Sequence, residues 1–274
     1  MTGLISQSKN LHIVLFSGGL SSAFALDEAL KAHGQENTIA LFTDPLWEDC
    51  DNYRFINQVA SHLSATLEHR KDGRTPEQIF FKTRLLISKQ IAKCSLILKT
   101  EQTLKFIKEL QQKNEKARST IKPILYFGIG INEEHRALNI TSRYSPIECR
   151  FPLLDKPMTK NEMWWACEQD WGIKVPRMYE MGFSHANCGG RCIKGGHEHF
   201  KRLYNVWPER YAEVEEIERR FREQINPKIA ILRDRTGGGK RYITLTEFRE
   251  RYIESNIKIE GLFQNNNLPC ECMF

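Results

Sequence analysis

The sequence predicts an α/β fold in which a mostly parallel sheet is covered by helices on both faces. Short apolar runs of strand length alternate with segments of helical periodicity along the first half of the chain. The first of these runs ends in a pair of glycines and the second ends in a carboxylate. Such residues at strand ends are typical of ligand sites at the carboxyl edge of a parallel sheet.

The first predicted strand spans residues 11–17 and leads into the glycine-rich segment SGGLSS, residues 17–22. Its glycines permit a tight turn and a close backbone approach to a ligand. A helix beginning near Leu20 directs its N–H groups and positive dipole end toward an anion. The segment therefore predicts a phosphate site, although it matches neither GxxxxGK[ST] nor GxGxxG. The alternative is a strand-to-helix turn without a ligand.

The following segments continue the alternation of strands and helices. We expect the first helix to end near His33-Gly34, further strands over 38–44, 65–69, 123–130 and 148–154, and helices over 50–63, 76–89 and the basic region 100–122. In the basic region, charged residues alternate with Leu104, Ile107 and Leu110 at helical spacing, so most of this charge is interpreted as a solvated face.

Beyond residue 157 the pattern changes to short helices. Thr159 and Glu162 form a capping-box pattern at the start of a helix predicted to run to Trp171. An amphipathic helix is predicted over 208–223, and a hairpin with strands at 230–232 and 242–245 encloses the glycine run at 236–240, interpreted as a flexible turn. We therefore predict a nucleotide-binding domain over residues 1–157 and a mostly helical region over residues 158–274.

Composition narrows the class of protein. The 274 residues are 41% hydrophobic and 27% charged, and no apolar run approaches the ~20 residues that cross a bilayer. The N-terminal segment lacks the apolar core of a signal peptide, so we expect a cytoplasmic protein with no membrane partner. A net charge of +6 suits an anionic partner such as a nucleic acid without requiring one.

The eight cysteines argue against a disulfide framework if the chain is cytoplasmic. Cys188 and Cys192 form CGGRC, and Cys270 and Cys272 form CEC near the C-terminus. Four thiolates suit a 4Fe-4S cluster or a structural zinc ion, and the spacing leans slightly toward iron-sulfur. The alternative is two pairs of buried or reactive thiols. Three nearby histidines are interpreted as ordinary packing or surface residues: His185, His197 and His199.

Several motifs in a fixed order resemble one family. They are Ser17 to Ser22, Phe42-Thr43-Asp44 with Trp47-Glu48-Asp49, Gly128-Ile129-Gly130 with Glu133 to Arg136, and Phe183 to Cys192 followed by CEC. Together they resemble the phosphoadenosine phosphosulfate reductase family in its broad sense, within the ATP pyrophosphatase superfamily. The similarity is greatest to members with NCGGxCxKxG, here Asn187 to Gly195, and a C-terminal CxC. It implies a Rossmann-like ATP pyrophosphatase domain with a helical, metal-binding extension.

The resemblance also implies the residues of the site. ATP or an adenylyl nucleotide would be bound by Ser17, Gly18, Gly19, Ser21, Ser22, Asp44, Gly128, Glu134 and Arg136. Asp44 would help to position Mg²⁺, and Arg136 would neutralise phosphate charge or meet the substrate, so these two are the candidate catalytic residues. The metal ligands would be Cys188, Cys192, Cys270 and Cys272.

Two departures from the family pattern shape the predicted function. The chain has neither the ECG-type segment of the reductases nor the paired CC and CxxC ligands of their cluster-binding relatives, and Ser21 stands where Asp is common in the loop. The first departure favours a different activity from sulfate reduction, and the second concerns how the loop binds magnesium and phosphate.

The leading prediction is an ATP-dependent, pyrophosphate-releasing iron-sulfur sulfurtransferase that acts on a nucleic acid, either a tRNA base or the DNA backbone. A cysteine desulfurase or another sulfur donor and a second copy of the chain are the further partners considered. One alternative is an adenylyl or phosphoadenylyl sulfate reductase. Another is a non-catalytic nucleotide- and cluster-binding subunit of a nucleic-acid modification or defence complex.

Overall fold

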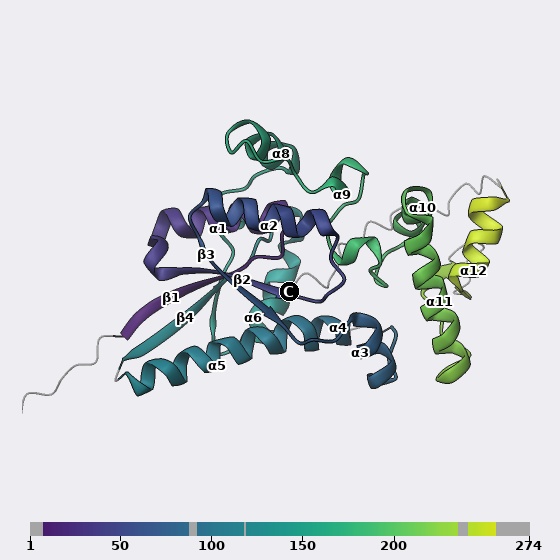
Figure 1. The fold of residues 1–274 in the computed structure, drawn as a ribbon, viewed down its shortest axis with the longest axis horizontal. Helices are drawn as coiled ribbons and strands as arrows, with labels where there is room; N and C mark the ends of the chain where they lie inside the picture. The colour runs from purple at the N-terminus through teal and green to yellow at the C-terminus, as the bar shows by residue number, and fades with distance from the viewer. Residues whose placement is uncertain (1–7, 88–91, 118, 235–240, 256–274) are drawn as a thin grey trace, which may run out of the picture.

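A parallel five-stranded sheet forms the centre of the protein (Figure 1). The computed structural model describes residues 8–87, 92–117, 119–234 and 241–255. The strands lie in the order β3-β2-β1-β4-β5, and their bounds are β1 Ser8–Leu15, β2 Thr38–Asp44, β3 Thr66–Lys71, β4 Thr120–Tyr126 and β5 Glu148–Arg150. This Rossmann-like arrangement confirms the predicted fold class. The chain reverses its direction across the sheet between β1 and β4, where such folds bind their ligands.

Helices cover both faces of the sheet, as Figure 1 shows for α1 and α2 on one side and α5 on the other. Successive residues of β1 alternate between the two cores: Val14 and Phe16 pack with α1 (Leu20–His33) and α2 (Cys50–His62). Ile13 and Leu15 pack with α5 (Glu101–Lys116) and α6 (His135–Tyr144). Burial on both faces explains why the second half of β1, from Leu11 to Leu15, is apolar apart from His12.

Several short elements connect these layers. They are η1 Gln35–Asn37, α3 Pro76–Thr83, α4 Lys93–Ser95, the π-helical η2 Leu96–Thr100, η3 Ile131–Glu133 and α7 Pro152–Asp155. The helix predicted to run to 89 stops at Thr83 because Arg84 is left-handed, with φ of 54°. The strand predicted over 148–154 ends at Arg150, since Pro152 starts α7.

The basic helix α5 has the solvated face that its periodicity predicts. Lys105, Lys108 and Lys113 are exposed, whereas Phe106 and Ile107 are buried against the sheet. Leu104 was expected on the apolar face, but it is 39% exposed. The buried residues of this helix are instead Gln102, Thr103, Phe106 and Ile107.

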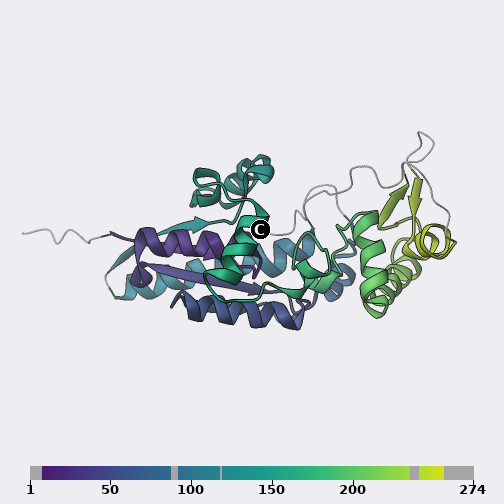
Figure 2. The same ribbon diagram turned by 90° about the horizontal axis from the view of Figure 1, so that it is seen from above.

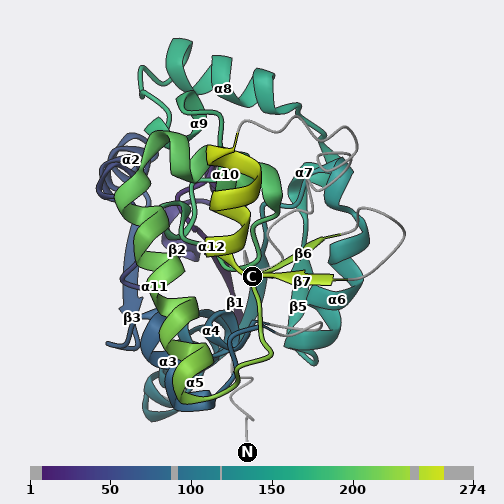
Figure 3. The ribbon, with the colours of Figure 1, turned by 90° about the vertical axis from the view of Figure 1, so that its right-hand side faces the viewer.

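The C-terminal region packs on the carboxyl edge of the sheet and on α1 (Figures 1 and 2). Its elements are α8 Lys160–Gln169, α9 Arg177–Glu180, η4 Cys188–Gly190, α10 His197–Val206, α11 Pro208–Gln224, β6 Leu232–Asp234, β7 Arg241–Ile243, α12 Leu245–Phe248 and the π-helical η6 Arg249–Glu254. Figure 3 shows α10, α11 and α12 together with the small β6-β7 sheet.

Several predictions for this region are confirmed. Thr159 and Glu162 form the expected capping box, and the apolar residues of α11 are buried: Tyr211, Val214, Ile217 and Phe221. β6 and β7 pair antiparallel, with Leu232 opposite Ile243. The glycine run at 236–240 lies outside the described residues.

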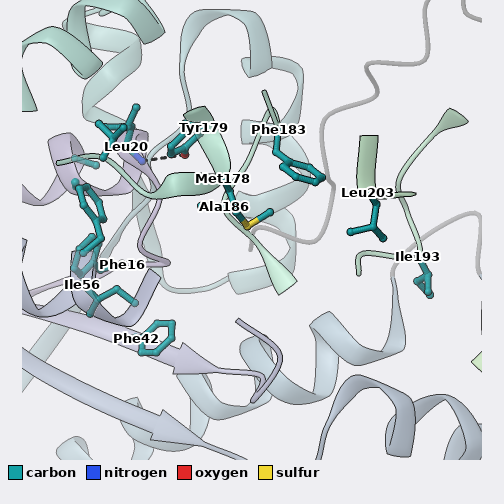
Figure 4. Close-up of a cluster of buried hydrophobic side chains, with 14 of the residues drawn as sticks. Phe16, Leu20, Phe42, Ile56, Met178, Tyr179, Phe183, Ala186, Ile193 and Leu203 are labelled. Carbon is teal, nitrogen blue, oxygen red and sulfur yellow. Dashed lines mark hydrogen bonds between the residues drawn. The ribbon is translucent and has the colours of Figure 1, made fainter. Parts of the chain in front are cut away.

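One hydrophobic cluster joins the sheet to the C-terminal region. Figure 4 shows Phe16, Leu20 and Ile56 near Met178 and Tyr179, and the same cluster continues to the helices of the C-terminal region. The two regions predicted on either side of residue 157 therefore share a core, and the boundary between them stays a prediction. None of the helices in the described ranges has the length and apolar character needed to span a membrane.

Candidate functional site

The glycine-rich loop lies in the turn between β1 and α1, where the fold favours an anion. Gly18 has φ of +80°, and a Cβ at this position would lie 2.6 Å from Asn52 Oδ1, so both backbone conformation and space require glycine. Gly19 is the N-cap of α1 and provides no side-chain cap for the helix. The first turn of α1 contains no acidic residue that could compete with a bound anion.

Gly128 brings the loop after β4 into contact with the glycine-rich loop. A Cβ on Gly128 would lie 2.5 Å from the carbonyl atoms of Ser21 and from the backbone nitrogen of Ser22. Any larger side chain would push the two loops apart. Gly128 was predicted to bind the nucleotide, and its observed contact is with the backbone that forms the loop.

Some polar groups of the loop form hydrogen bonds within the protein, and others are available as donors to a ligand. The buried Ser22 hydroxyl donates to the Gly19 carbonyl at 2.8 Å and lies 3.4 Å from Ser17 Oγ, so both serines stiffen the loop. The N–H of Leu20 donates to the hydroxyl of Tyr179 at 3.2 Å. Within the described residues, no acceptor contacts the N–H groups of Ser21 and Ser22. These two amides and the Ser21 hydroxyl can bind an anion.

A cleft of about 310 Å³ opens beside this loop. It is lined by Gly19, Ser21, residues 130–133, residues 157–160, Glu162, Met163, Tyr179, Ser184 and His185. Of the predicted nucleotide-binding residues, Gly19 and Ser21 thus face the cleft. Glu134 is exposed beside it. The cleft lies at the reversal point of the sheet, between the loops that follow β1 and β4.

Two residues of this cleft, Lys160 and Tyr179, were missed by the sequence analysis. The Lys160 ammonium donates to the Ser184 carbonyl and lies 4.8 Å from the centroid of the Tyr179 ring. Burial lowers the pKa of Lys160, an effect that Glu133 opposes, and burial raises the pKa of Tyr179 to about 12. The Tyr179 hydroxyl keeps its proton at neutral pH and can donate it to a ligand oxygen. The glycine-rich loop precedes both residues by more than a hundred positions in the sequence. Their place beside it therefore depends on the fold.

The two candidate catalytic residues lie in internal networks. Asp44, at the end of β2, is 3% exposed, and its Oδ1 accepts the Leu46 N–H at 2.7 Å and the Tyr53 hydroxyl at 2.8 Å. Its Oδ2 lies 3.0 Å from His69 Nε2. Burial and the neighbouring Asp44 carboxylate raise the pKa of Tyr53, which therefore stays a donor. Arg136 is buried and forms an ion pair with Glu133 at the start of α6.

The predicted metal ligands Cys188 and Cys192 lie on the loop between α9 and α10. Cys188, Gly189 and Gly190 have left-handed φ angles of 53°, 54° and 83°. A Cβ on Gly190 would lie 2.9 Å from Leu203 Cδ1, so this turn needs its glycine. Cys188 adopts the same conformation with a side chain, which is a strained state that its surroundings must maintain. We call residues 187–195 the cysteine loop.

A small cavity of about 20 Å³ brings a third thiol to the cysteine loop. Cys94, which belongs to neither of the two cysteine pairs in the sequence, lines it together with Cys188 and Cys192. Pro45, Trp47, Phe80 and Lys99 are among the other residues of its wall. No three His, Cys, Asp or Glu side chains of the described residues are placed to hold a metal ion.

The two remaining predicted metal ligands are cysteines near the C-terminus, and histidines flank the cysteine loop. Cys270 and Cys272 lie outside the described residues, so the four-cysteine set stays a prediction. His199 Nε2 lies 2.6 Å from the Gly190 carbonyl oxygen, and His197 is buried beside Phe248. Both contacts agree with the packing role expected for these histidines.

The segment after β2 anchors the cysteine loop to the sheet. Arg191 donates to the Trp47 carbonyl at 3.2 Å, and the N–H of Cys188 donates to Glu48 Oε2 at 2.8 Å. Arg210 joins the Gly189 carbonyl, at 2.9 Å, to Asp49 Oδ2, at 2.7 Å. The carboxyl edge of β2 and the cysteine loop therefore form one bonded unit.

Asp49 is the charged centre of this unit. Its side chain is 1% exposed and accepts two bonds from Arg177, at 2.8 and 2.7 Å, besides the bond from Arg210. Burial alone would raise the pKa of Asp49, but the bonds from Arg177 and Arg210 outweigh it and hold this pKa below its usual value. Asp49 is thus ionised and paired at neutral pH.

The parallel sheet, the glycine-rich turn after β1 and the cleft at the reversal point define an α/β protein with a nucleotide-binding fold. Residues 11–116 match the family model described as "Phosphoadenosine phosphosulfate reductase domain". This match agrees with the resemblance to the phosphoadenosine phosphosulfate reductase family, in its broad sense, that the motifs of the chain indicated. The matched part contains the glycine-rich loop, Asp44 and Cys94, whereas the cysteine loop lies beyond it.

One solved structure similar to this chain is phosphoadenylyl-sulfate (PAPS) reductase from Candida auris in its phosphate complex. The two chains are 16% identical, the similarity covers 66% of this chain and 82% of that one, and the TM-score is 0.43. Among curated proteins, no sequence is significantly similar to this chain.

Proposed function

We propose that this protein is an ATP-dependent sulfurtransferase that activates an oxygen of its acceptor as an adenylate and then replaces that oxygen with sulfur. The observation that carries the proposal is the direct bonding between the edge of the nucleotide-binding sheet and the cysteine loop, through Trp47, Glu48 and Asp49. An enzyme that couples nucleotide chemistry to thiol or metal chemistry needs these two parts in one rigid unit.

The cleft supplies the groups that adenylylation requires. The acceptor oxygen would attack the α-phosphorus of ATP, and pyrophosphate would leave with the bonding electron pair. The N–H groups of Ser21 and Ser22 and the dipole of α1 would stabilise the leaving pyrophosphate. Sulfur, as hydrosulfide or an equivalent nucleophile, would then displace AMP from the acceptor.

Lys160 suits the phosphate-neutralising role that the resemblance implied for Arg136. Lys160 lines the cleft, whereas the guanidinium of Arg136 is buried and already paired with Glu133. The hydroxyl of Tyr179 supports the same role, since it lies against the loop and retains its proton. Mg²⁺ would bridge the phosphate oxygens, and Asp44 stays the proposed carboxylate for it.

The kind of donor atom in the cysteine cavity supports the proposal of a soft metal, although the described thiols alone are not placed to hold one. Among the described residues, the wall of the cavity carries the thiols of Cys94, Cys188 and Cys192 and no carboxylate, and thiols are the donors of a 4Fe-4S cluster or, alternatively, zinc. We propose Cys188, Cys192, Cys270 and Cys272 as ligands, with Cys94 as a competing candidate because it lines the same cavity. A bound cluster would supply iron that can carry the sulfur to be transferred.

A nucleic acid is the proposed acceptor. The net charge of +6 and the exposed lysines of α5 suit a polyanion, and both a tRNA base and the DNA backbone offer an oxygen that adenylylation would activate. A cysteine desulfurase is the proposed sulfur donor.

The test is turnover by anaerobically purified protein supplied with ATP, Mg²⁺, sulfide and either tRNA or DNA. The expected result is release of pyrophosphate that depends on the nucleic acid, together with sulfur in the nucleic acid. Lys160→Ala should raise the KM for ATP about tenfold or more, whereas the matched control Lys156→Ala, on an exposed lysine paired with Glu28, should not. Absence of acceptor-dependent pyrophosphate release with either nucleic acid would contradict the proposal.

The metal ligands have a separate test. Cys188→Ser and Cys192→Ser should lower the iron bound per chain and change the visible absorbance, and Cys94→Ser tests the competing ligand. Cys149→Ser is the control because Cys149 lies on β5, outside the cavity. Unchanged metal content in both loop variants would exclude the cysteine loop as the metal site.

A second candidate function is the reduction of adenylyl or phosphoadenylyl sulfate. It is favoured by the description of the family model that matches residues 11–116. The two functions differ in their products, because a reductase releases sulfite when it is supplied with the sulfonucleotide and a thiol reductant. Tight ATP binding without turnover in either assay would instead favour the third candidate, a non-catalytic subunit of a nucleic-acid modification or defence complex.

A further inference from the structure

A continuous path of polar contacts joins the glycine-rich loop to the cysteine loop. Asn52 Nδ2 donates to the carbonyl oxygen of Ser17 at 3.3 Å and to Glu48 Oε2 at 3.4 Å. The same Glu48 oxygen accepts the N–H of Cys188 at 2.8 Å. One amide and one carboxylate therefore separate the backbone of the phosphate loop from the backbone of the predicted metal loop.

The side chains of this path are buried, so a change in the path's geometry would leave polar groups without a hydrogen-bond partner. Glu48 is 9% exposed and Asn52 is 1% exposed, so water cannot readily replace a lost partner. Asn52 also contacts the loop through Gly18, since a Cβ on this glycine would lie 2.6 Å from Asn52 Oδ1. Within the described residues this Oδ1 is buried without a hydrogen-bond partner. A shift of Gly18 must therefore move Asn52, and with it the bond to Glu48.

Cys188 is the residue that most needs such support. Its φ of +53° is unfavourable for a residue with a side chain. A strained backbone of this kind persists only where the surrounding structure holds it. The carboxylate of Glu48 provides a charge-assisted bond to the N–H of that same residue. The direction in which the Cys188 thiol projects thus depends on Glu48.

We propose that Glu48 is a positioning residue that couples nucleotide binding to the order of the cysteine loop, with Asn52 as the link. An anion bound by the N–H groups of Ser21 and Ser22 restrains the glycine-rich loop, and the restraint passes through Asn52 and Glu48 to Cys188. When ligand binding has made one site rigid, less conformational entropy is lost when the other site becomes ordered. The coupling is reciprocal, so an ordered cysteine loop also strengthens nucleotide binding. This inference rests on the proposed nucleotide binding.

Amide hydrogen exchange of the whole chain, with and without ATP and Mg²⁺, tests the coupling directly. Calorimetry under the same conditions first establishes whether ATP binds. We expect ATP to slow the exchange of residues 184–195 about fivefold or more, the lower range of ordinary coupling between sites. This readout needs neither turnover nor a bound metal. A loop that is only structurally supported by Glu48 would not respond to ATP.

Variants of the path separate coupling from stability. Glu48→Ala should speed the exchange of residues 184–195 without ATP and abolish its response to ATP, whereas Glu48→Gln, which retains an acceptor oxygen, should keep most of the response. Asn52→Leu should keep the bond from Cys188 to Glu48 and still lose the response. Glu213→Ala is the matched control because it removes the exposed carboxylate that pairs with Arg191 of the same loop and leaves the path intact.

The outcomes distinguish this inference from the proposed function. If calorimetry detects no ATP binding, the nucleotide function is wrong and the coupling falls with it. If ATP binds and the exchange of residues 184–195 is unchanged, the coupling alone is overturned. If Glu48→Ala does not fold, Glu48→Gln and Asn52→Leu decide the question, and an undiminished ATP response in Asn52→Leu also contradicts the inference.

Discussion

The carboxylate of Glu48 accepts the backbone N–H of Cys188 at 2.8 Å, across 140 positions of sequence. This bond joins the segment that follows β2 to the loop that carries two of the predicted metal ligands. Around it, Arg177 and Arg210 converge on Asp49, so the junction is fixed by charge as well as by packing. A nucleotide-binding sheet and a cysteine-bearing loop thereby share one set of anchoring residues.

Asp49 should be the most sensitive residue of this junction. Asp49→Asn removes a charge that is 1% exposed and leaves Arg177 and Arg210 without their carboxylate. Removing one partner of a buried ion pair typically costs about 3–5 kcal/mol, which is the expected loss in the free energy of unfolding. Denaturant unfolding measures this loss. The control Glu216→Gln removes a carboxylate that forms surface pairs with Arg219 and Arg220, and it should cost less than about 1 kcal/mol. Equal effects of the two variants would contradict this prediction.

Gly128 should be essential for the shape of the phosphate site. Gly128→Ala places a Cβ 2.5 Å from the backbone of Ser21 and must separate the loops after β1 and β4. Overpacking of this kind typically costs about 1–3 kcal/mol. We expect a lower melting temperature and a loss of ATP affinity of about tenfold or more by calorimetry. Gly130→Ala is the control for stability, because a Cβ there has open space and the backbone is extended. A normal melting temperature and affinity in Gly128→Ala would show that the loops tolerate separation.

The elements predicted most accurately from the sequence are those whose ends are set by residues within the same segment. The strand over 38–44 was predicted with its observed bounds, because an apolar run buried on both faces ends at the polar Asp44. The helix from Leu20 was predicted to stop where Gly34 caps it, and Gly34 has the positive φ of such caps. The glycine-rich loop was recognised for the same reason, since Gly18 needs a backbone conformation that favours glycine.

The parts of the site that were missed depend on contacts between distant segments. Cys94 joins Cys188 and Cys192 only because the segment before α5 packs against the cysteine loop. Lys160 and Tyr179 reach the cleft because α8 and α9 fold back over the glycine-rich loop. Conversely, Arg136 was predicted from the sequence to bind a ligand, but in the fold its guanidinium forms an ion pair with Glu133. Periodicity and spacing contain no information on such pairings.

Glu218 should make the stability of the C-terminal region depend on pH near neutrality. Its carboxylate is 1% exposed and accepts the N–H groups of Ile231 and Leu245, each at 2.6 Å, and burial raises its pKa from 4.5 to about 7. Because the folded state binds this proton more tightly than the unfolded state does, stability should fall as pH rises from 4.5 through about 7. Glu218→Gln should abolish this slope. The variant should also lose about 1–3 kcal/mol in the free energy of unfolding. The Gln amide has only one acceptor oxygen, so its NH₂ group would face one of the two backbone N–H groups. Unfolding free energies at several pH values measure both effects, and an unchanged slope in the variant would contradict the assignment.

His12 should produce the opposite dependence at lower pH. Its ring stacks on His33 with centroids 3.5 Å apart, and its Nδ1 lies 3.0 Å from the Tyr126 hydroxyl inside the sheet. Burial, together with His33, lowers the pKa of His12 from 6.5 to about 4. The unfolded state therefore binds the proton more readily, and stability should fall as pH drops from 6.5 toward 4. The shift predicts a loss of roughly 2–3 kcal/mol over this window.

Thermal unfolding across this pH window tests the role of His12, with two variants. His12→Phe removes the titrating group, so the acid-induced decrease in melting temperature should become smaller, whatever the stability of the variant at neutral pH. His135→Gln is the control, because His135 is exposed at the start of α6 and should leave the decrease unchanged. The two effects have different locations and opposite signs, since acid weakens the sheet through His12 while it protects the C-terminal region through Glu218. A steep acid-induced decrease that persists in His12→Phe would mean that other groups cause the acid sensitivity of the sheet.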